Sequence, residues 1–77
     1  MTERFDPDIC LDLALTPEGV REIRRLMGWS QESMARQVGV SLNTVFRWET
    51  AKHKVTPRHR GAIREAVARA QSVPSSE

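Results

Sequence analysis

Residues 31–50 read QESMARQVGVSLNTVFRWET, which predicts two short helices joined by a tight turn. Gly39 can adopt the left-handed backbone conformation that the turn requires, and the small Ala35 lets the second helix cross close to the first. The inward contacts are expected from apolar residues of both helices and the turn: Met34, Val38, Val40, Val45 and Trp48. Together these positions meet the requirements of a helix-turn-helix motif.

Start and stop signals predict further helices on both sides of this unit. Thr16 and Pro17 begin a helix that ends at Gly28, and Thr56 with Pro57 begins a last helix that reaches residue 71. Ser30 and Ser41 are the expected N-caps of the two central helices, and the second of these is expected to run over 42–51. We therefore predict an all-α domain over residues 16–71, followed by a disordered tail at 72–77.

The leader, residues 1–15, allows two interpretations. Ile9, Leu11, Leu13 and Leu15 alternate with other residues at the period of a half-buried strand, which slightly favours an extended segment. Asp6 and Pro7 form an equally acceptable helix start, and Ile9 and Leu13 are one helical turn apart. A lone strand needs a pairing partner, which a second copy of the chain could supply. The leader is therefore a candidate segment for dimerisation or for binding a partner.

Length and composition limit the classes of function. The 77 residues make one small domain, and the single Cys10 excludes an intrachain disulfide and a cysteine-based zinc cluster. His53 and His59 have no ligand cluster around them, so we expect no metal and no cofactor. The chain has no nucleophile–base arrangement and no phosphate-binding loop, and we expect no enzyme activity. The absence of a long apolar run or an N-terminal signal favours a soluble, cytoplasmic protein.

Charge is unevenly distributed along the chain. Residues 1–20 carry five acidic side chains against Arg4, whereas residues 21–77 carry eleven basic side chains against five acidic ones. The net charges of these parts are −4 and +6. A basic body suggests a polyanionic partner, although a solvated charged surface would give the same count.

Residues 28–49, GWSQESMARQVGVSLNTVFRWE, resemble the helix-turn-helix of the phage-repressor family of the Cro/cI, or XRE, type. The preceding LTPEGVREIRRLMG resembles the first helix of that family. The resemblance covers residues 16–57 and leaves out the leader, and the LTPE opening is also similar to some antitoxins. It implies a compact lambda-repressor-like fold of four to five helices, encoded by a bacterium, phage or plasmid.

The helix after the turn is the expected DNA-reading helix. Its periodicity places Val45 and Trp48 on the core side, and it places Asn43 and Arg47 on the opposite side. In such motifs this helix enters the major groove, where Asn matches adenine and Arg matches guanine. The candidate base-reading residues are Ser41, Leu42, Asn43, Thr44, Phe46 and Arg47. For Leu42 and Phe46, contact with thymine methyl groups and packing against another part of the chain or a second chain both remain open.

Phosphate contacts are expected around this helix. The resemblance places Gln31 on a phosphate, at a helix N-terminus whose backbone N–H groups favour anions. The candidate phosphate-binding residues are Ser30, Gln31, Thr50, Lys52 and Lys54.

The sequence thus predicts a transcriptional regulator, a repressor, that reads double-stranded DNA as a homodimer on a palindromic operator. The alternative is an antitoxin or protein-interaction module. It would bind a toxin or a polymerase subunit through the leader or through the surface of Leu42 and Phe46.

Overall fold

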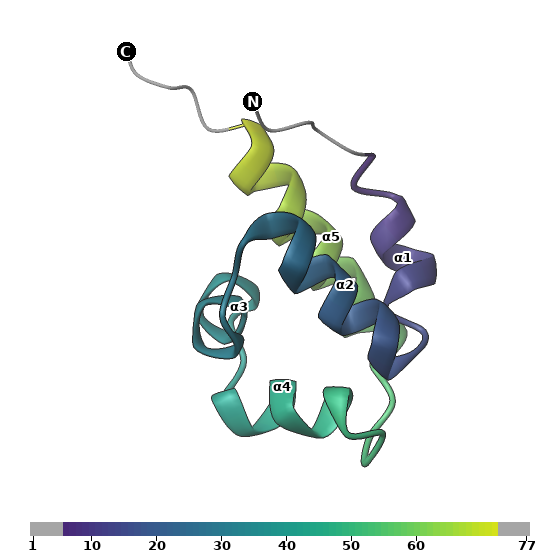
Figure 1. Cartoon of the computed structure of the whole chain (residues 1–77). Coiled ribbons are helices and arrows are strands. Elements are labelled where there is room, and N and C mark those ends of the chain that lie inside the picture. The colour runs from purple at the N-terminus through teal and green to yellow at the C-terminus, as the bar shows by residue number, and fades with distance from the viewer. Residues whose placement is uncertain (1–5, 73–77) are drawn as a thin grey trace.

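The computed structural model describes residues 6–72, which form five helices (Figure 1). They are α1 (Ile9–Leu13), α2 (Pro17–Met27), α3 (Gln31–Val38), α4 (Leu42–Glu49) and α5 (Pro57–Ser72). No strand occurs in this part of the chain, so the prediction of an all-α fold of four to five helices is confirmed. The tail predicted at 72–77 lies outside the described residues, apart from Ser72 at the end of α5.

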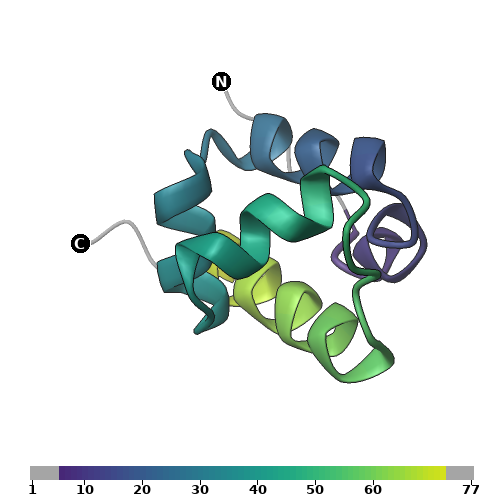
Figure 2. The same cartoon turned by 90° about the horizontal axis from the view of Figure 1, so that it is seen from below.

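The long helix α5 packs against α1 and α3, while α4 packs against α2 and α3. Seen from below, α4 lies nearest the viewer and one of its sides faces away from the rest of the domain (Figure 2). None of the helices between residues 6 and 72 combines the length and apolar character that a membrane-spanning helix needs.

The predicted caps define the starts of α2, α3 and α4. Each cap hydroxyl accepts a hydrogen bond of 3.0 or 3.1 Å from the backbone N–H three residues later: Thr16 from Gly19, Ser30 from Ser33, and Ser41 from Thr44. Gly28 and Gly39 end α2 and α3 with φ angles of 70° and 87°. These values lie in the left-handed region that glycine adopts without strain.

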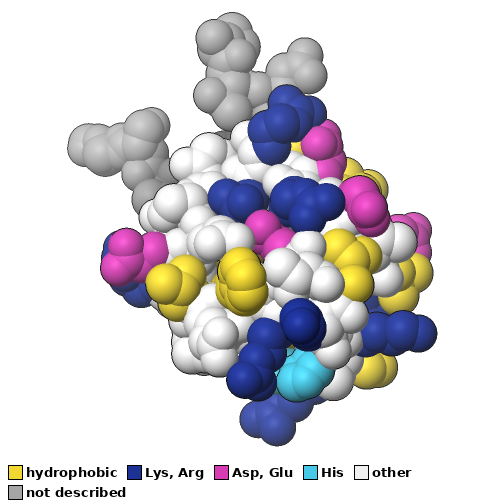
Figure 3. Space-filling view, turned by 60° about the horizontal axis from the view of Figure 1, so that its bottom comes forward, with side chains coloured by type: hydrophobic (Ala, Val, Ile, Leu, Met, Phe, Trp, Pro, Cys, Tyr) yellow, Lys and Arg dark blue, Asp and Glu magenta, His cyan; other side chains and the backbone are white. Residues whose placement is uncertain are grey.

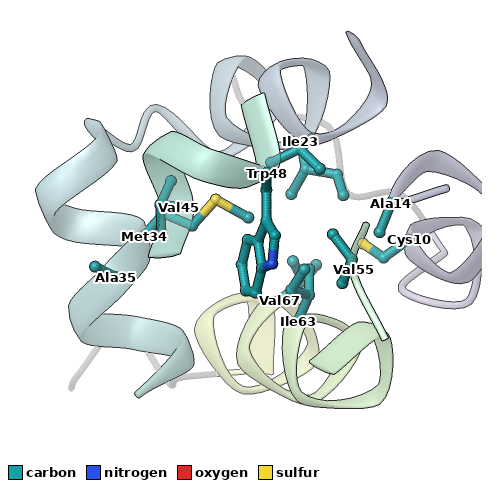
Figure 4. Close-up of a cluster of buried hydrophobic side chains, with 11 residues drawn as sticks. Cys10, Ala14, Ile23, Met34, Ala35, Val45, Trp48, Val55, Ile63 and Val67 are labelled. Carbon is teal, nitrogen blue, oxygen red and sulfur yellow. The ribbon is translucent and has the colours of Figure 1, made fainter. Parts of the chain in front are cut away.

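Trp48 occupies the middle of one hydrophobic core and is only 3% exposed. Its indole ring lies between Met34 of α3 and the Ile63–Val67 side of α5 (Figure 4). Val45 is fully buried beside it. The prediction that Val45 and Trp48 form the core side of α4 is confirmed.

The leader contains the short helix α1 (Ile9–Leu13), so the preference for an extended segment was wrong. Cys10 and Ala14, which are four residues apart, are the buried residues of this segment, whereas Ile9, Leu11 and Leu15 are exposed. The alternation of the larger apolar residues was misleading because two smaller residues face the core. Asp6 and Pro7 start the turn, with an Asp6 carboxylate oxygen accepting a hydrogen bond from the backbone N–H of Asp8.

The leader helix α1 belongs to the same core as the helix-turn-helix. Cys10 and Ala14 pack in the cluster that also contains Trp48. Burial raises the pKa of the Cys10 thiol to about 11, so this thiol stays protonated at neutral pH. On the outer side, Asp8 pairs with Arg64 of α5.

Helix α4 ends at Glu49, two residues before the expected end at 51. Thr50 is its C-cap, and Ala51 has a φ angle of 62°, in the left-handed region. The backbone N–H of Lys52 then donates to the carbonyl of Arg47 at 3.0 Å, which is the hydrogen bond of a Schellman motif. Alanine can cap in this way only with steric strain between its Cβ and the backbone.

We expect Ala51→Gly to raise the free energy of unfolding by about 0.5–1 kcal/mol, since glycine removes the strain at the cost of some unfolded-state entropy. Urea unfolding followed by Trp fluorescence measures the change. Gly39→Ala is the reverse control, because it places a Cβ on a residue with a φ angle of 87°. A stability loss in Ala51→Gly would show that the conformation of residue 51 carries no strain.

Candidate nucleic-acid interface

The outward side of α4 carries two parallel rows of side chains. Asn43 and Arg47 form a polar row, and Leu42 and Phe46 form an apolar row, because residues four apart lie one above the other on a helix. All four residues are exposed, while Val45 and Trp48 on the opposite side are buried. Figure 3 looks onto this side of the molecule and shows hydrophobic side chains among those of Lys and Arg.

The polar row is available for an outside partner. Within residues 6–72, Asn43 and Arg47 make no side-chain hydrogen bond or ion pair. The hydroxyl groups of Ser41 and Thr44, in contrast, lie 2.9 Å apart and hydrogen-bond to each other at the start of α4. Ser41 therefore fixes the start of the helix, and Asn43 and Arg47 are the freer of the predicted base-reading side chains.

The apolar row takes no part in the core. Leu42 and Phe46 are each 49% exposed. The core is filled from the other side of α4, by Val45 and Trp48. Packing within the described residues therefore leaves both side chains half exposed.

The predicted phosphate-binding residues lie around the ends of α3 and α4. Ser30 caps α3, and Gln31 is its first residue. Thr50 caps the end of α4, where its hydroxyl donates to the carbonyl of Phe46 at 3.0 Å and must rotate away before it can donate to a phosphate. Lys52 and Lys54 are exposed in the loop after α4 and form no ion pair with the described part of the chain.

Glu49 holds α4 in position through a buried cluster that the sequence analysis missed. Its carboxylate accepts hydrogen bonds from Arg24 Nε at 2.6 Å, Arg24 Nη2 at 3.0 Å and Gln31 Nε2 at 3.0 Å. Its backbone carbonyl accepts from Arg21 Nη1 at 2.7 Å. Since Arg24 lies on α2 and Gln31 on α3, this one residue of α4 links three helices.

A signal for this cluster was present in the sequence. Four residues after Val45, Glu49 lies about 40° from it around the helix and therefore on the core side. A carboxylate on a buried helix face needs a cationic partner, and a search for one would have led to α2. Arg24 fits this requirement, and it also donates from Nη1 to the carbonyl of Trp29 at 3.2 Å.

Basic side chains gather at one end of the outward side of α4. Lys52, His53 and Lys54 are all exposed directly after this helix. In Figure 3, Lys and Arg side chains lie around a histidine near the lower edge of the molecule. The described residues contain no group of three or more His, Cys, Asp or Glu side chains that could hold a metal ion.

A comparison with protein families matches residues 20–59 to a family described as Helix-turn-helix. The matched segment begins in α2, contains all of α3 and α4, and ends at the start of α5. It therefore covers about half of the chain, including both rows of α4 and the Glu49 cluster. No curated protein and no solved structure gave a match.

Proposed function

Since the chain belongs to the phage-repressor (Cro/cI, or XRE) type of the helix-turn-helix family, we propose that it is a repressor that binds a specific operator sequence as a homodimer. At the coarser level, it is a DNA-binding transcription regulator.

The observation that supports this proposal most is the contrast between the two sides of α4. One side is anchored by Trp48 and Glu49, and the other presents Asn43 and Arg47 without partners in residues 6–72. A helix with side chains is about 10–12 Å across, which suits a major groove about 12 Å wide. There Arg47 would donate to the N7 and O6 atoms of guanine, and Asn43 would pair with adenine.

Phosphate contacts would set the register of α4 in the groove. Gln31 uses one amide N–H for Glu49, which leaves its second N–H for a phosphate oxygen at the N-terminus of α3. Lys52 and Lys54 would approach the backbone beyond the other end of α4. Such contacts supply affinity and orientation, and the base contacts supply specificity.

A homodimer is proposed because one α4 of eight residues can reach only a few base pairs. Two copies related by a two-fold axis would read two half-sites about 10–10.5 base pairs apart. Selection of bound duplexes from random DNA, followed by footprinting, tests this directly. A palindromic consensus is expected, whereas enrichment of single, unrepeated sites would contradict the dimer. Transcription in vitro from a promoter that carries the selected site should fall when the protein is added, if the protein represses.

We expect Arg47→Ala to weaken binding to the selected duplex by about 1–3 kcal/mol and to relax the preference at one base pair. The physical reason is the loss of a bidentate contact with guanine. Equilibrium binding to a panel of duplexes, each changed at one base pair, measures both effects. Arg47→Lys is the matched control: it keeps the charge but loses the planar fork. If Arg47→Lys binds with unchanged specificity, Arg47 contacts a phosphate instead of a base.

Lys52→Ala separates the phosphate contacts from base reading. It should weaken binding about equally for all duplexes and lower the slope of log affinity against log salt by about 1. A change in base preference would contradict the assignment of Lys52 to a phosphate.

A second function, binding of a partner protein through the leader, has one observation in its favour. Ile9, Leu11 and Leu15 are 38%, 39% and 56% exposed. Deleting the leader is a poor test, because Cys10 and Ala14 belong to the core. The double substitution Leu11→Ser and Leu15→Ser preserves both buried residues. Loss of a stoichiometric protein partner from this variant would favour an antitoxin-like role.

A further inference from the structure

The apolar row of α4 stands among the polar and charged side chains of the same surface. Leu42 and Phe46 are half exposed, and the residues next to them, Asn43 and Arg47, are exposed and unpaired within residues 6–72. A half-exposed apolar side chain alone needs no explanation. Here two such side chains lie in line along α4, the helix that is proposed to enter the major groove. Both would therefore face DNA in the complex.

The fold itself does not require these two side chains. Val45, Trp48 and Glu49 attach α4 to the domain from the other side. Leu42 and Phe46 can therefore be shortened without opening the core.

Charge favours DNA over a second protein chain as the partner of this row. Arg47 borders it on α4, and Lys52 and Lys54 follow the helix, all three exposed. An exposed carboxylate on α4 would repel the phosphates of DNA. The carboxylate of this helix, Glu49, is instead buried and held by Arg24. A polyanion that lies along Asn43 and Arg47 is therefore next to Leu42 and Phe46 on the same exposed side of α4.

The chemistry of base edges limits what an apolar side chain can contact there. A leucine or phenylalanine that packs against an amino group or a carbonyl oxygen of a base displaces the water bound to that group. It cannot replace the lost hydrogen bond. Thymine is the base whose major-groove edge carries an apolar group, the C5 methyl. Four residues of helix rise about 6 Å, which corresponds to roughly two steps of 3.4 Å between base pairs.

We propose that Leu42 and Phe46 read the C5 methyl groups of two thymines, one or two base pairs apart, next to the bases read by Asn43 and Arg47. The inference rests on the proposed function, since it describes the same DNA site. The two rows of α4 then recognise different bases. The polar row selects purines by hydrogen bonds, and the apolar row selects thymine by contact with its methyl group.

Deoxyuridine provides the test, because it differs from thymidine only by the C5 methyl group. In the duplex obtained by selection, each thymine is replaced by uracil in turn, and the affinity of the full chain is measured. We expect about a fourfold loss at each of two positions in a half-site, the effect of one buried methyl group. The remaining thymines serve as matched controls and should tolerate the replacement.

The protein variants assign each methyl group to a side chain. Leu42→Ala should remove the difference between thymine and uracil at one position, and Phe46→Ala should remove it at the other. Sedimentation without DNA and urea unfolding accompany the variants, to detect a change in association or in folding.

The outcomes separate this inference from the function on which it rests. If uracil is tolerated everywhere while Arg47→Ala still weakens binding, the methyl reading is wrong and the proposed function stands. If the alanine variants lose affinity equally for thymine and uracil, or dissociate a dimer without DNA, the apolar row packs on protein and the inference also fails. If no duplex is enriched by selection, the proposed function fails together with the inference.

Discussion

Glu49→Ala is expected to lower the free energy of unfolding by about 3–5 kcal/mol, the usual cost of removing one partner of a buried ion pair. The Glu49 side chain is only 4% exposed, and that of Arg24 is 22% exposed. Without the carboxylate, the guanidinium of Arg24 loses two hydrogen bonds and keeps its charge in a partly buried place. Against the 5–15 kcal/mol of a typical domain, this loss leaves little stability. Urea unfolding followed by Trp fluorescence measures it.

The matched control is the pair of Glu22 and Arg25 on the surface of α2. The two hydrogen bonds have the same arrangement, with Arg25 Nε at 3.0 Å from one oxygen of Glu22 and Nη2 at 2.5 Å from the other. The side chains of Arg25 and Glu22 are 69% and 40% exposed, so Glu22→Ala should cost far less stability than Glu49→Ala. If Glu49→Ala and Glu22→Ala cost the same, burial adds nothing to the Arg24–Glu49 pair, and the three-helix cluster is not what stabilises α4.

A further variant separates the net contribution of the Arg24–Glu49 ion pair to the free energy of unfolding from the cost of removing only one of its partners. Replacing both partners, with Arg24→Met and Glu49→Leu, removes the charges together and can recover much of the stability. It also removes the partner of Gln31, whose amide donates to Glu49 at 3.0 Å. DNA binding by this double variant would therefore report whether Gln31 must be held in place by Glu49.

Local signals predicted most of the helical framework. Thr16, Ser30 and Ser41 act within single turns, and their hydroxyl groups make the capping bonds that their residue types favour. Trp48 and Val45 were assigned to the core from the helix-turn-helix pattern and helical periodicity, and they are buried. Such features depend on residues a few positions apart and so can be read from the sequence.

Features that depend on distant residues were not predicted. Arg24 and Glu49 are 25 positions apart in the sequence, so no local pattern indicates that they pair. In the leader, two small residues, Cys10 and Ala14, face the core because α5 and α2 pack there, and periodicity of the larger residues pointed to a strand. The exposed side of α4 could be located from its core side, but the bases that it reads depend on the DNA and stay a prediction.

Gly19→Ala is expected to destabilise the domain by about 3 kcal/mol, at the upper end of the range for overpacking. A Cβ built on Gly19 would lie 1.6 Å from the carbonyl oxygen of Leu13 and 2.5 Å from its carbonyl carbon. Both are backbone atoms at the end of α1, so no side-chain rotation relieves the clash. Either α1 moves away from α2 or the start of α2 unwinds. Thermal unfolding followed by circular dichroism gives the stability, and the rate at which a thiol reagent modifies Cys10 reports whether α1 has moved.

Gly61→Ala is the matched control, and its expected effect has the opposite sign. Gly61 also lies inside a helix, α5, but a Cβ there would meet nothing within 4 Å. Helix propensity favours alanine over glycine by about 1 kcal/mol at both positions, so the difference between the two variants isolates the contact with Leu13. Stabilisation by both substitutions would mean that α1 does not rest against Gly19. Destabilisation by Gly19→Ala with rapid modification of Cys10 would instead show that this glycine is what allows the leader to complete the core behind the helix-turn-helix.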